Sequence, residues 1–411
     1  MLVDALDGDS EPTYYPAIIS QGATYGDLTP PTAASAPAIT LGGTSATLMG
    51  DIISNDDAKI NYLGGNSVDT YGPAAPRNLF RTSYNLSYSE TSKESQQPIV
   101  EFKTSCPQFE IYSYGASSGF RLLVDGEFAG EFDAHGSDGS LKYILIDFTA
   151  INAAAQSRNI RIEYSTKGTF GGLVLDTVGV LEVPKDVGDS ICYLGDSFTE
   201  GTGVGETVKS DGYVGVSAKL LGYDNYSASG FGGTGYFRPN DPGYGEIRPA
   251  LVDRVQYDGV GYDAYVVAMG LNDDDLIDIS AEINSTFDIL RVNNPSAPIF
   301  VLGTWGNGSG GLIKTNIESY IESAVAGREG FYFIPVYQES FTKSDATHPD
   351  ASGHATLGAY VAQEIQSILD SRTYGTAVNI TSADAEKFTL NTSTDPDQWE
   401  NADKTTIIEV A

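Results

Sequence analysis

The sequence has 411 residues, of which 55 are Asp or Glu and 23 are Lys or Arg, so its formal net charge at pH 7 is −32. A surface this acidic repels nucleic acids and anionic membranes, and we expect neither as a partner. No stretch approaches the roughly 20 consecutive apolar residues that span a bilayer.

Residues 1–48 are rich in Pro, Ala, Thr and Gly, which predicts an arm or linker. Residues 1–16 lack the basic start and the apolar core of a signal peptide. We expect an extracellular protein, or one associated with a virion or a cell surface. Export by another route and prior removal of a signal segment both stay open. A cytoplasmic location stays open.

Residues 49–185 consist of short runs rich in β-branched and aromatic residues, separated by turn residues. Asp125 and Gly126 lie between two such runs and predict a two-residue hairpin turn, because both positions favour positive φ. No run has convincing helical periodicity. The pattern predicts an all-β domain, a sandwich or a jelly roll.

Residues 186–374 alternate short apolar strands with helices, which predicts a parallel sheet covered on both faces, an α/β/α domain. Residues 375–411 form a polar C-terminal extension whose role the sequence leaves open. The expected strands are ICYLG, DNYSASG, DAYVVAMG, PIFVLGTW and FYFIPV, and the expected helices cover about 207–221, 278–293, 312–327 and 351–370.

The two cysteines fall in different predicted domains, Cys106 in the first and Cys192 in the second. A disulfide would have to join two separate cores, so we expect two buried free thiols. No Cys/His spacing typical of zinc is present.

Polar residues follow three of the predicted strands at their carboxyl ends, where parallel sheets bind ligands. Ser197, preceded by Asp196, follows the first strand, and its own N–H points to where an oxyanion would form. Gly230 ends the second strand, and Gly232 belongs to the glycine run that follows it. Asn272 follows the third strand and offers a neutral amide donor.

A serine nucleophile needs a base, and the base needs an orienting carboxylate. The chain has three histidines. His135 falls in a loop of the β domain and His354 in the last predicted helix, whereas His348 shares a loop with Asp345. We therefore predict His348 as the base and Asp345 as its partner.

An acidic run, Asp273-Asp274-Asp275, follows Asn272. Such a run can hold a metal ion, but it also suits the start of a helix, where negative charge is favourable. We favour capping of the following helix, and we expect no metal site.

Four segments, around Ser197, Gly230, Asn272 and the Asp345–His348 pair, resemble in this order the conserved blocks of the SGNH (GDSL-type) hydrolase superfamily over residues 189–370. The resemblance implies that Ser197 attacks an ester carbonyl, His348 carries its proton and Asp345 orients His348. It implies an oxyanion hole made of the Ser197 and Gly230 N–H groups and the Asn272 side chain, with Gly232 as the alternative to Gly230. It implies no metal or cofactor. The matching residues are Gly195-Asp196-Ser197 with Thr199 and Gly201, Gly230 in NYSASG, Gly270-Leu271-Asn272-Asp273, and Asp345-Ala346-Thr347-His348.

A β-sandwich directly before such a domain resembles carbohydrate esterase family 2 and related deacetylases, and residues 120–132 (FRLLVDGEFAGEF) look like a hairpin of their sandwich. The resemblance implies a serine esterase that removes acetyl groups from a polysaccharide or acts on another small acetyl ester. Candidate substrate contacts are Asp196, Gly232, Tyr236 and Trp305, since aromatic rings stack on sugars.

Two alternatives to a carbohydrate deacetylase stay open. A lipolytic short-chain esterase is disfavoured because the sequence contains no long apolar lid. The second alternative is a structural or adhesive protein of a virion or cell surface, whose hydrolase domain trims a glycan or is inactive. The sequence does not predict the oligomeric state.

Overall fold

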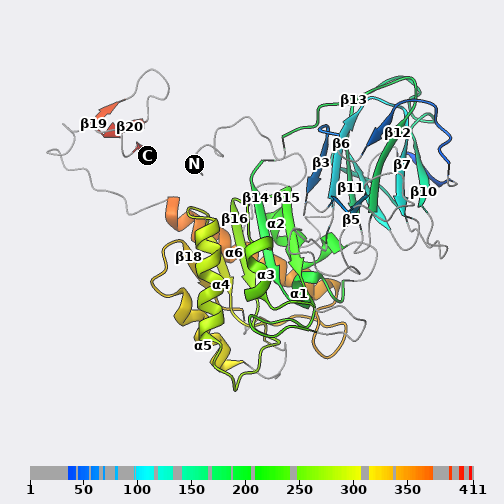
Figure 1. Ribbon diagram of the computed structural model, residues 1–411. Helices are drawn as coiled ribbons and strands as arrows, with labels where there is room; N and C mark the ends of the chain where they lie inside the picture. Colours follow the sequence, from blue (N-terminus) through cyan, green and yellow to red (C-terminus); the bar gives the residue numbers. More distant parts are fainter. Residues whose placement is uncertain are drawn as a thin grey trace. The chain divides into compact units, whose positions relative to one another are not determined.

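The chain forms two compact units in the computed structural model, Met1–Ile365 and Gln366–Ala411 (Figure 1). His135, residues 1–35 of the predicted arm and residues 241–247 lie outside the part that the structure describes. The described residues are 36–42, 45–54, 57–63, 68–69, 79–81, 97, 99–114, 119–132, 141–164, 169–186, 188–204, 209–240, 248–306, 314–336, 339–373, 388–390, 398–401 and 407–409.

The first part of the larger unit is an antiparallel β-sandwich, as the alternating sequence predicted. One sheet has the strand order β1-β10-β7-β12-β5-β4 with β2 paired to β12, and the other has the order β13-β6-β11-β8-β9 with β3 paired to β6. The strands are β1 (Ala38–Leu41), β2 (Ile52–Ser54), β3 (Ile60–Leu63), β4 (Val68–Asp69), β5 (Leu79–Arg81), β6 (Ile99–Thr104), β7 (Gln108–Tyr114), β8 (Phe120–Val124), β9 (Glu127–Phe132), β10 (Leu141–Asp147), β11 (Arg158–Tyr164), β12 (Thr169–Leu175) and β13 (Leu181–Glu182).

The sandwich buries one face of each sheet in a shared apolar core. Phe102 and Phe109 pack edge to face at 5.3 Å between ring centroids, and Phe120 and Ile146 belong to the same core. The predicted hairpin turn between β8 and β9 is confirmed, because Asp125 and Gly126 have φ values of 48° and 91°.

The predicted boundary of the sandwich at residue 49 is wrong. Strand β1 lies inside the predicted arm and pairs with β10, with Ile39 beside Ile146. The arm composition concealed this strand because its four residues, AITL, are too few to show an alternating pattern.

The second part of the larger unit contains five parallel strands in the order β15-β14-β16-β17-β18. Because β14 comes first in the chain, the order reverses between β14 and β16, where open parallel sheets bind their ligands. The elements are β14 (Ser190–Gly195), α1 (Ser197–Glu200), α2 (Tyr213–Leu220), β15 (Asn225–Gly230), α3 (Leu251–Asp258), β16 (Ala264–Ala268), α4 (Ser280–Asn293), β17 (Ile299–Leu302), α5 (Thr315–Val325), β18 (Phe331–Ile334) and α6 (Ala351–Thr373), with a 3₁₀ turn, η3 (Lys209–Asp211), before α2.

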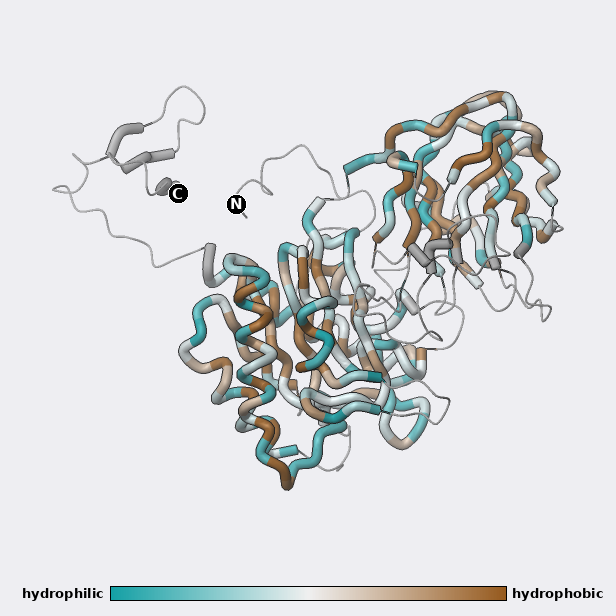
Figure 2. Tube along the Cα trace, in the orientation of Figure 1, coloured by the Kyte–Doolittle hydropathy of each residue, from teal (hydrophilic) through white to brown (hydrophobic). Residues whose placement is uncertain are grey.

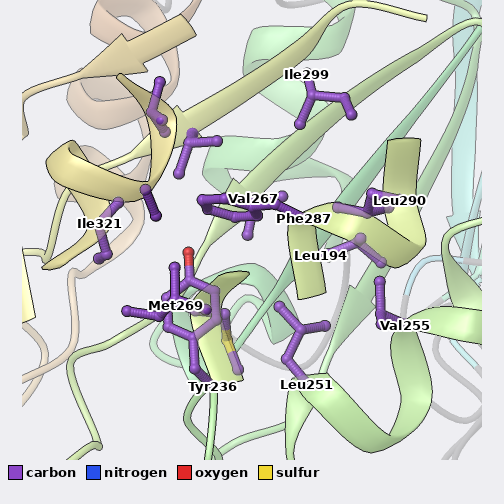
Figure 3. Packing of buried hydrophobic residues seen from close by; sticks show 14 of the residues in the cluster. Leu194, Tyr236, Leu251, Val255, Val267, Met269, Phe287, Leu290, Ile299 and Ile321 are labelled. Carbon is purple, nitrogen blue, oxygen red and sulfur yellow. The ribbon is translucent and has the colours of Figure 1, made fainter. Parts of the chain in front are cut away.

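Helices cover both faces of the parallel sheet, as predicted. Side chains of α3, α4 and α5, such as Leu251, Phe287 and Ile321, pack with strand residues such as Val267 on one face (Figure 3). Helices α2 and α6 meet in a second apolar cluster that contains Val216, Leu220 and Ala362. Figure 2 shows hydrophobic residues along the central strands.

The structure adds one helix that the sequence did not predict, the eight-residue α3. Helix α1, which begins at Ser197, has four residues. In the smaller unit, β19 (Phe388–Leu390), β20 (Gln398–Asn401) and β21 (Ile407–Glu409) form a three-stranded antiparallel sheet. Both cysteines are buried thiols that form no disulfide, as predicted. Among the described helices, none combines the length and apolarity that a membrane crossing needs.

Within the larger unit, charged side chains of the sandwich contact the α/β domain. Glu163 on β11 is fully buried and accepts a hydrogen bond from Ser210 Oγ at 2.7 Å. Its carboxylate lies 3.0 Å from Arg161 and 3.6 Å from Lys219 of α2. Burial raises its pKa, but Lys219, Arg161 and Arg121 outweigh burial and hold the pKa of Glu163 below its usual range.

Candidate active site

Ser197 lies at the first position of α1, where β14 ends. The Asp196 carboxylate caps this short helix by accepting the Phe198 N–H at 3.0 Å. Gly195 has to be glycine, because a Cβ there would collide with the Thr199 hydroxyl. The serine is 8% exposed, so close packing of the turn holds it at the carboxyl edge of the sheet.

The structure brings Ser197, His348 and Asp345 into one hydrogen-bonded line. His348 Nε2 lies 3.0 Å from Ser197 Oγ, and His348 Nδ1 lies 2.8 Å from Asp345 Oδ2. An ionised carboxylate only accepts hydrogen bonds, so Nδ1 carries the proton toward Asp345. Nε2 is then free to accept the serine hydroxyl.

Asp345 is half-exposed but firmly held. Its Oδ1 accepts the backbone N–H groups of Thr347 and His348, both at 2.7 Å. Hydrogen bonds from the His348 backbone, the His348 ring and the Thr347 backbone hold the pKa of Asp345 well below its usual range. Asp345 is therefore ionised at neutral pH, and it fixes the imidazole orientation.

The two glycine candidates have different surroundings. Gly230 is the last residue of β15 and pairs in register with Gly195. A Cβ at Gly230 would collide with the backbone of Thr199 and Glu200, so only glycine lets α1 pack there. A Cβ at Gly232 would lie 3.5 Å from Ser197 Cβ, and the Gly232 N–H donates to Glu200 Oε2 at 2.8 Å.

Asn272 lies at the same edge, after β16. Its Nδ2 donates to Thr234 O at 2.9 Å and lies 3.4 Å from Asp196 Oδ2. The backbone carbonyl of Asn272 accepts a hydrogen bond from Arg238 Nη1 at 2.9 Å. These contacts join the asparagine loop to the residues that follow the glycines.

The acidic run does not cap the following helix α4, contrary to the prediction. The Asp273 carboxylate accepts the N–H groups of Tyr236, Phe237 and Arg238, at 2.7, 3.1 and 3.1 Å. Asp275 Oδ1 accepts the N–H groups of Asn316 and Ile317 at the start of α5. The run therefore joins loops that are adjacent only because the strand ends of the sheet converge.

Asp196 is fully buried below the candidate nucleophile. Burial raises its pKa to about 7, and the neighbouring carboxylates of Asp273 and Glu200 act in the same direction, against the Phe198 N–H and Arg254. This burial contradicts a direct substrate contact for Asp196, whose carboxylate holds the nucleophile turn.

Tyr236 and Trp305 are also buried, at 0% and 2% exposure, and not on a surface that contacts a sugar. Tyr236 packs in the core with Phe287 and Met269 (Figure 3). Trp305 stacks on Phe198 at 5.4 Å with 7° between the ring planes. The prediction of substrate stacking is wrong for both, because aromatic residues at strand ends filled the core instead.

Three buried polar residues near the site were missed by sequence reasoning. Glu200 binds the Gly232 N–H and lies 3.4 Å from Arg248. His354 accepts the Tyr213 N–H at 3.2 Å and donates Nε2–H to Thr202 O at 2.9 Å. Arg254 lies on the unpredicted helix α3. Within the described residues, no three His, Cys, Asp or Glu side chains gather to hold a metal ion.

The fold and the site together define a two-domain protein, in which a β-sandwich precedes a three-layer α/β/α domain with Ser, His and Asp at the carboxyl edge of its sheet. No protein-family model and no curated protein sequence matches the chain. Solved structures do match it.

The similar solved structures share both domains. A family two carbohydrate esterase from Cellvibrio japonicus is 16% identical, with 81% of this chain and 99% of that chain covered and a TM-score of 0.58. A family two carbohydrate esterase from Clostridium thermocellum, solved with cellohexaose, is 17% identical, with 81% of this chain and 99% of that chain covered and a TM-score of 0.55. A salicylyl-acyltransferase from a tetracycline biosynthetic pathway is 14% identical, with 77% of this chain and 98% of that chain covered and a TM-score of 0.57. The predicted fold is confirmed.

Proposed function

We propose that this chain is a serine esterase that hydrolyses acetyl or other short-chain esters, with an O-acetylated polysaccharide as substrate. The observation that carries the proposal is the line from Ser197 Oγ to His348 Nε2 and from His348 Nδ1 to Asp345 Oδ2. A hydroxyl, a base and an orienting carboxylate in this geometry activate a serine nucleophile.

The reaction follows from the positions of the protons. Ser197 Oγ attacks the ester carbonyl while His348 Nε2 takes the hydroxyl proton, and Asp345 stabilises the imidazolium that forms. The imidazolium then protonates the departing alcohol, which leaves an acyl group on Ser197. Water attacks this acyl group, His348 takes the water proton and returns it to Ser197 Oγ, and acetate is released.

The proposed oxyanion hole contains the Ser197 and Gly230 N–H groups and the Asn272 amide. Such donors stabilise the charge that develops in the transition state. Gly232 is the alternative to Gly230. A Cβ built on Gly232 would lie 3.5 Å from Ser197 Cβ, but the Gly232 N–H is bonded to Glu200, so a substrate that used this N–H would displace that carboxylate.

The polysaccharide part of the proposal draws on the similar structures. Two of them are family two carbohydrate esterases, each matched over 99% of its own length, and one was solved with cellohexaose. The acyltransferase shares the fold, and an acyl-enzyme can pass its acyl group to an alcohol instead of water. We propose water as the acceptor, and a location outside the cell, where such polymers occur.

Acetate release tests the proposed function. Wild type and Ser197→Ala are incubated with acetylated xylan, acetylated mannan, a chitin-type acetylated polymer, an acetylated bacterial capsule polysaccharide and 4-nitrophenyl acetate. We expect wild type to free acetate from at least one polymer and Ser197→Ala to free none. If wild type frees no acetate from any of them, the esterase proposal is wrong. Polymer binding without release would favour an adhesive role.

A further inference from the structure

Arg254 is a fully buried cation at the carboxyl ends of the two strands that carry the site. It extends from α3, and its Nη2 donates to Gly195 O at 2.8 Å. Its Nη1 donates to Ser229 Oγ at 2.6 Å and lies 3.3 Å from Ser229 O. One guanidinium therefore bonds to the ends of both β14 and β15.

The counter-ion of Arg254 comes from the same helix. Asp258 lies one turn later, its Oδ2 is 2.9 Å from Arg254 Nη1, and both side chains have 0% exposure. Ser229 Oγ also donates to Asp258 Oδ2 at 2.9 Å. The carboxylate and the serine hydroxyl together fix where the guanidinium points.

Stability alone gives little reason for this ion pair. Its helical neighbours Leu251 and Val255 belong to the apolar core of the sheet. Removing two charges from water is costly, and well-packed apolar residues in place of a buried ion pair are often as stable or more so. The contacts of the pair with the backbone near Ser197 point to a role in the site.

Those contacts involve residues close in the chain to Ser197 and Gly230, two of the proposed oxyanion donors. Gly195, two residues before Ser197, accepts Arg254 and also the Phe231 N–H at 3.0 Å. The guanidinium carbon lies 4.6 Å from the centre of the Phe231 ring. Arg254 thus bonds to the backbone before the nucleophile and to Ser229, and it lies over the ring of Phe231, so it contacts the residues on either side of Gly230.

We propose that Arg254 is a positioning residue for the esterase reaction: it sets the separation between the Ser197 turn and the glycine segment, so that their N–H groups converge on one oxyanion. This inference rests on the proposed function. A lysine cannot replace it, because an ammonium group lacks the planar fork that bonds two strand ends at once.

Arg254→Lys tests the proposal, with Arg291→Lys as the matched control. Arg291 on α4 also donates to backbone carbonyls, those of Asn294, Pro295 and Ala297 at 2.9–3.0 Å, and lies over the Phe331 ring at 4.9 Å. It does so at the amino ends of β17 and β18. Both variants therefore lose the same kind of bonds, at opposite edges of the sheet.

The first readout is kcat and KM for 4-nitrophenyl acetate, with kcat expressed per active serine as counted by titration with a fluorophosphonate. The second readout is the affinity for a phenylboronic acid, which forms a tetrahedral adduct with the serine. For Arg254→Lys we expect kcat to fall by about 10- to 100-fold, the scale of a displaced catalytic group. KM should stay within about threefold, and boronate affinity should fall in parallel with kcat. Arg291→Lys should lower Tm only.

Retention of kcat and boronate affinity by Arg254→Lys, as in Arg291→Lys, would overturn the positioning role and leave the esterase proposal intact. If Arg254→Lys does not fold, Ser229→Ala decides, because it removes only the hydroxyl that joins Arg254 and Asp258. It should lower kcat and boronate affinity together, by at least threefold, and unchanged values would overturn the role. If wild type cleaves no ester, the rate of fluorophosphonate labelling replaces kcat as the readout.

Discussion

His348 places its Nε2 3.0 Å from the Oγ of Ser197, although 151 positions separate the two residues in the sequence. Ser197 follows β14 inside the sheet, and His348 lies in the loop after β18 at the sheet edge. Because all five strands are parallel, both residues leave the sheet on the same side. The loop that carries His348 then reaches across the ends of β17 and β16.

Asp345→Asn should lower kcat by roughly 10²- to 10⁴-fold, because an amide that turns its NH₂ toward the ring disfavours the imidazole tautomer that accepts the serine proton. Steady-state kinetics with 4-nitrophenyl acetate measure this loss. Asp350→Asn is the matched control, because Asp350 is another carboxylate near this loop and accepts from Thr342 Oγ1 and the Gly353 N–H. A loss of less than threefold in Asp345→Asn would contradict the role of Asp345.

The acid side of the pH profile should report one proton. The pKa of Asp345 is held well below its usual range, so its ionised form persists as the pH falls and does not limit activity. Protonation of His348 removes the base, so log(kcat/KM) should fall with a slope of one. A profile that stays flat down to the pH at which the protein unfolds would contradict histidine as the base, and a slope of two would mean that Asp345 gains a proton in the same step.

Asp196→Asn should change how stability depends on pH. The folded chain raises the pKa of Asp196 from 3.8 to about 7, so the folded state keeps a proton that the unfolded chain releases near its ordinary pKa. The free energy of unfolding therefore falls as the pH rises between these two values. The asparagine variant lacks this loss and still accepts the Phe198 N–H through its amide oxygen.

Urea unfolding of both proteins at pH 5 and pH 8 measures this effect, since the other titrating groups cancel. The free energy of unfolding of Asp196→Asn, minus that of wild type, should be larger at pH 8 than at pH 5 by on the order of 1–3 kcal/mol. An equal stability difference at both pH values would show that Asp196 ionises as easily in the folded protein as in the unfolded chain.

Glu163→Gln should destabilise the larger unit by about 3–5 kcal/mol, because it leaves Arg161 and Lys219 buried without their shared carboxylate. Glu182→Gln is the surface control. Glu182 lies 3.5 Å from Lys103, and the two side chains are 28% and 35% exposed. Such pairs contribute about 0–1 kcal/mol. Urea unfolding compares the two, and equal losses would contradict the buried role of Glu163.

The sequence predicted the parts of the fold whose signal is local. Four of the five strands of the parallel sheet, β14, β16, β17 and β18, have a compact apolar run, and Asp125-Gly126 dictates its own turn. The order of the residues after those runs also identified Ser197, Asn272 and His348, because the carboxyl ends of parallel strands must meet.

What the sequence did not predict depends on tertiary packing. Helix α3 is short, and its Arg254 and Asp258 look like solvent-facing charges until the fold buries them. Tyr236 looked like a surface aromatic after a glycine run, but Asp273 binds the backbone there and turns the ring into the core. The partner of a polar group far along the chain is not written in its local pattern.

The central claim is that Ser197 carries the acyl group. Wild type mixed with 4-nitrophenyl acetate, quenched in acid within the first turnovers and digested, should give an acetylated peptide whose modified residue is Ser197. The adduct should be absent from Ser197→Ala, which should also release no acetate. Acetate release by Ser197→Ala at the wild-type rate, with no adduct on Ser197 in wild type, would contradict the account.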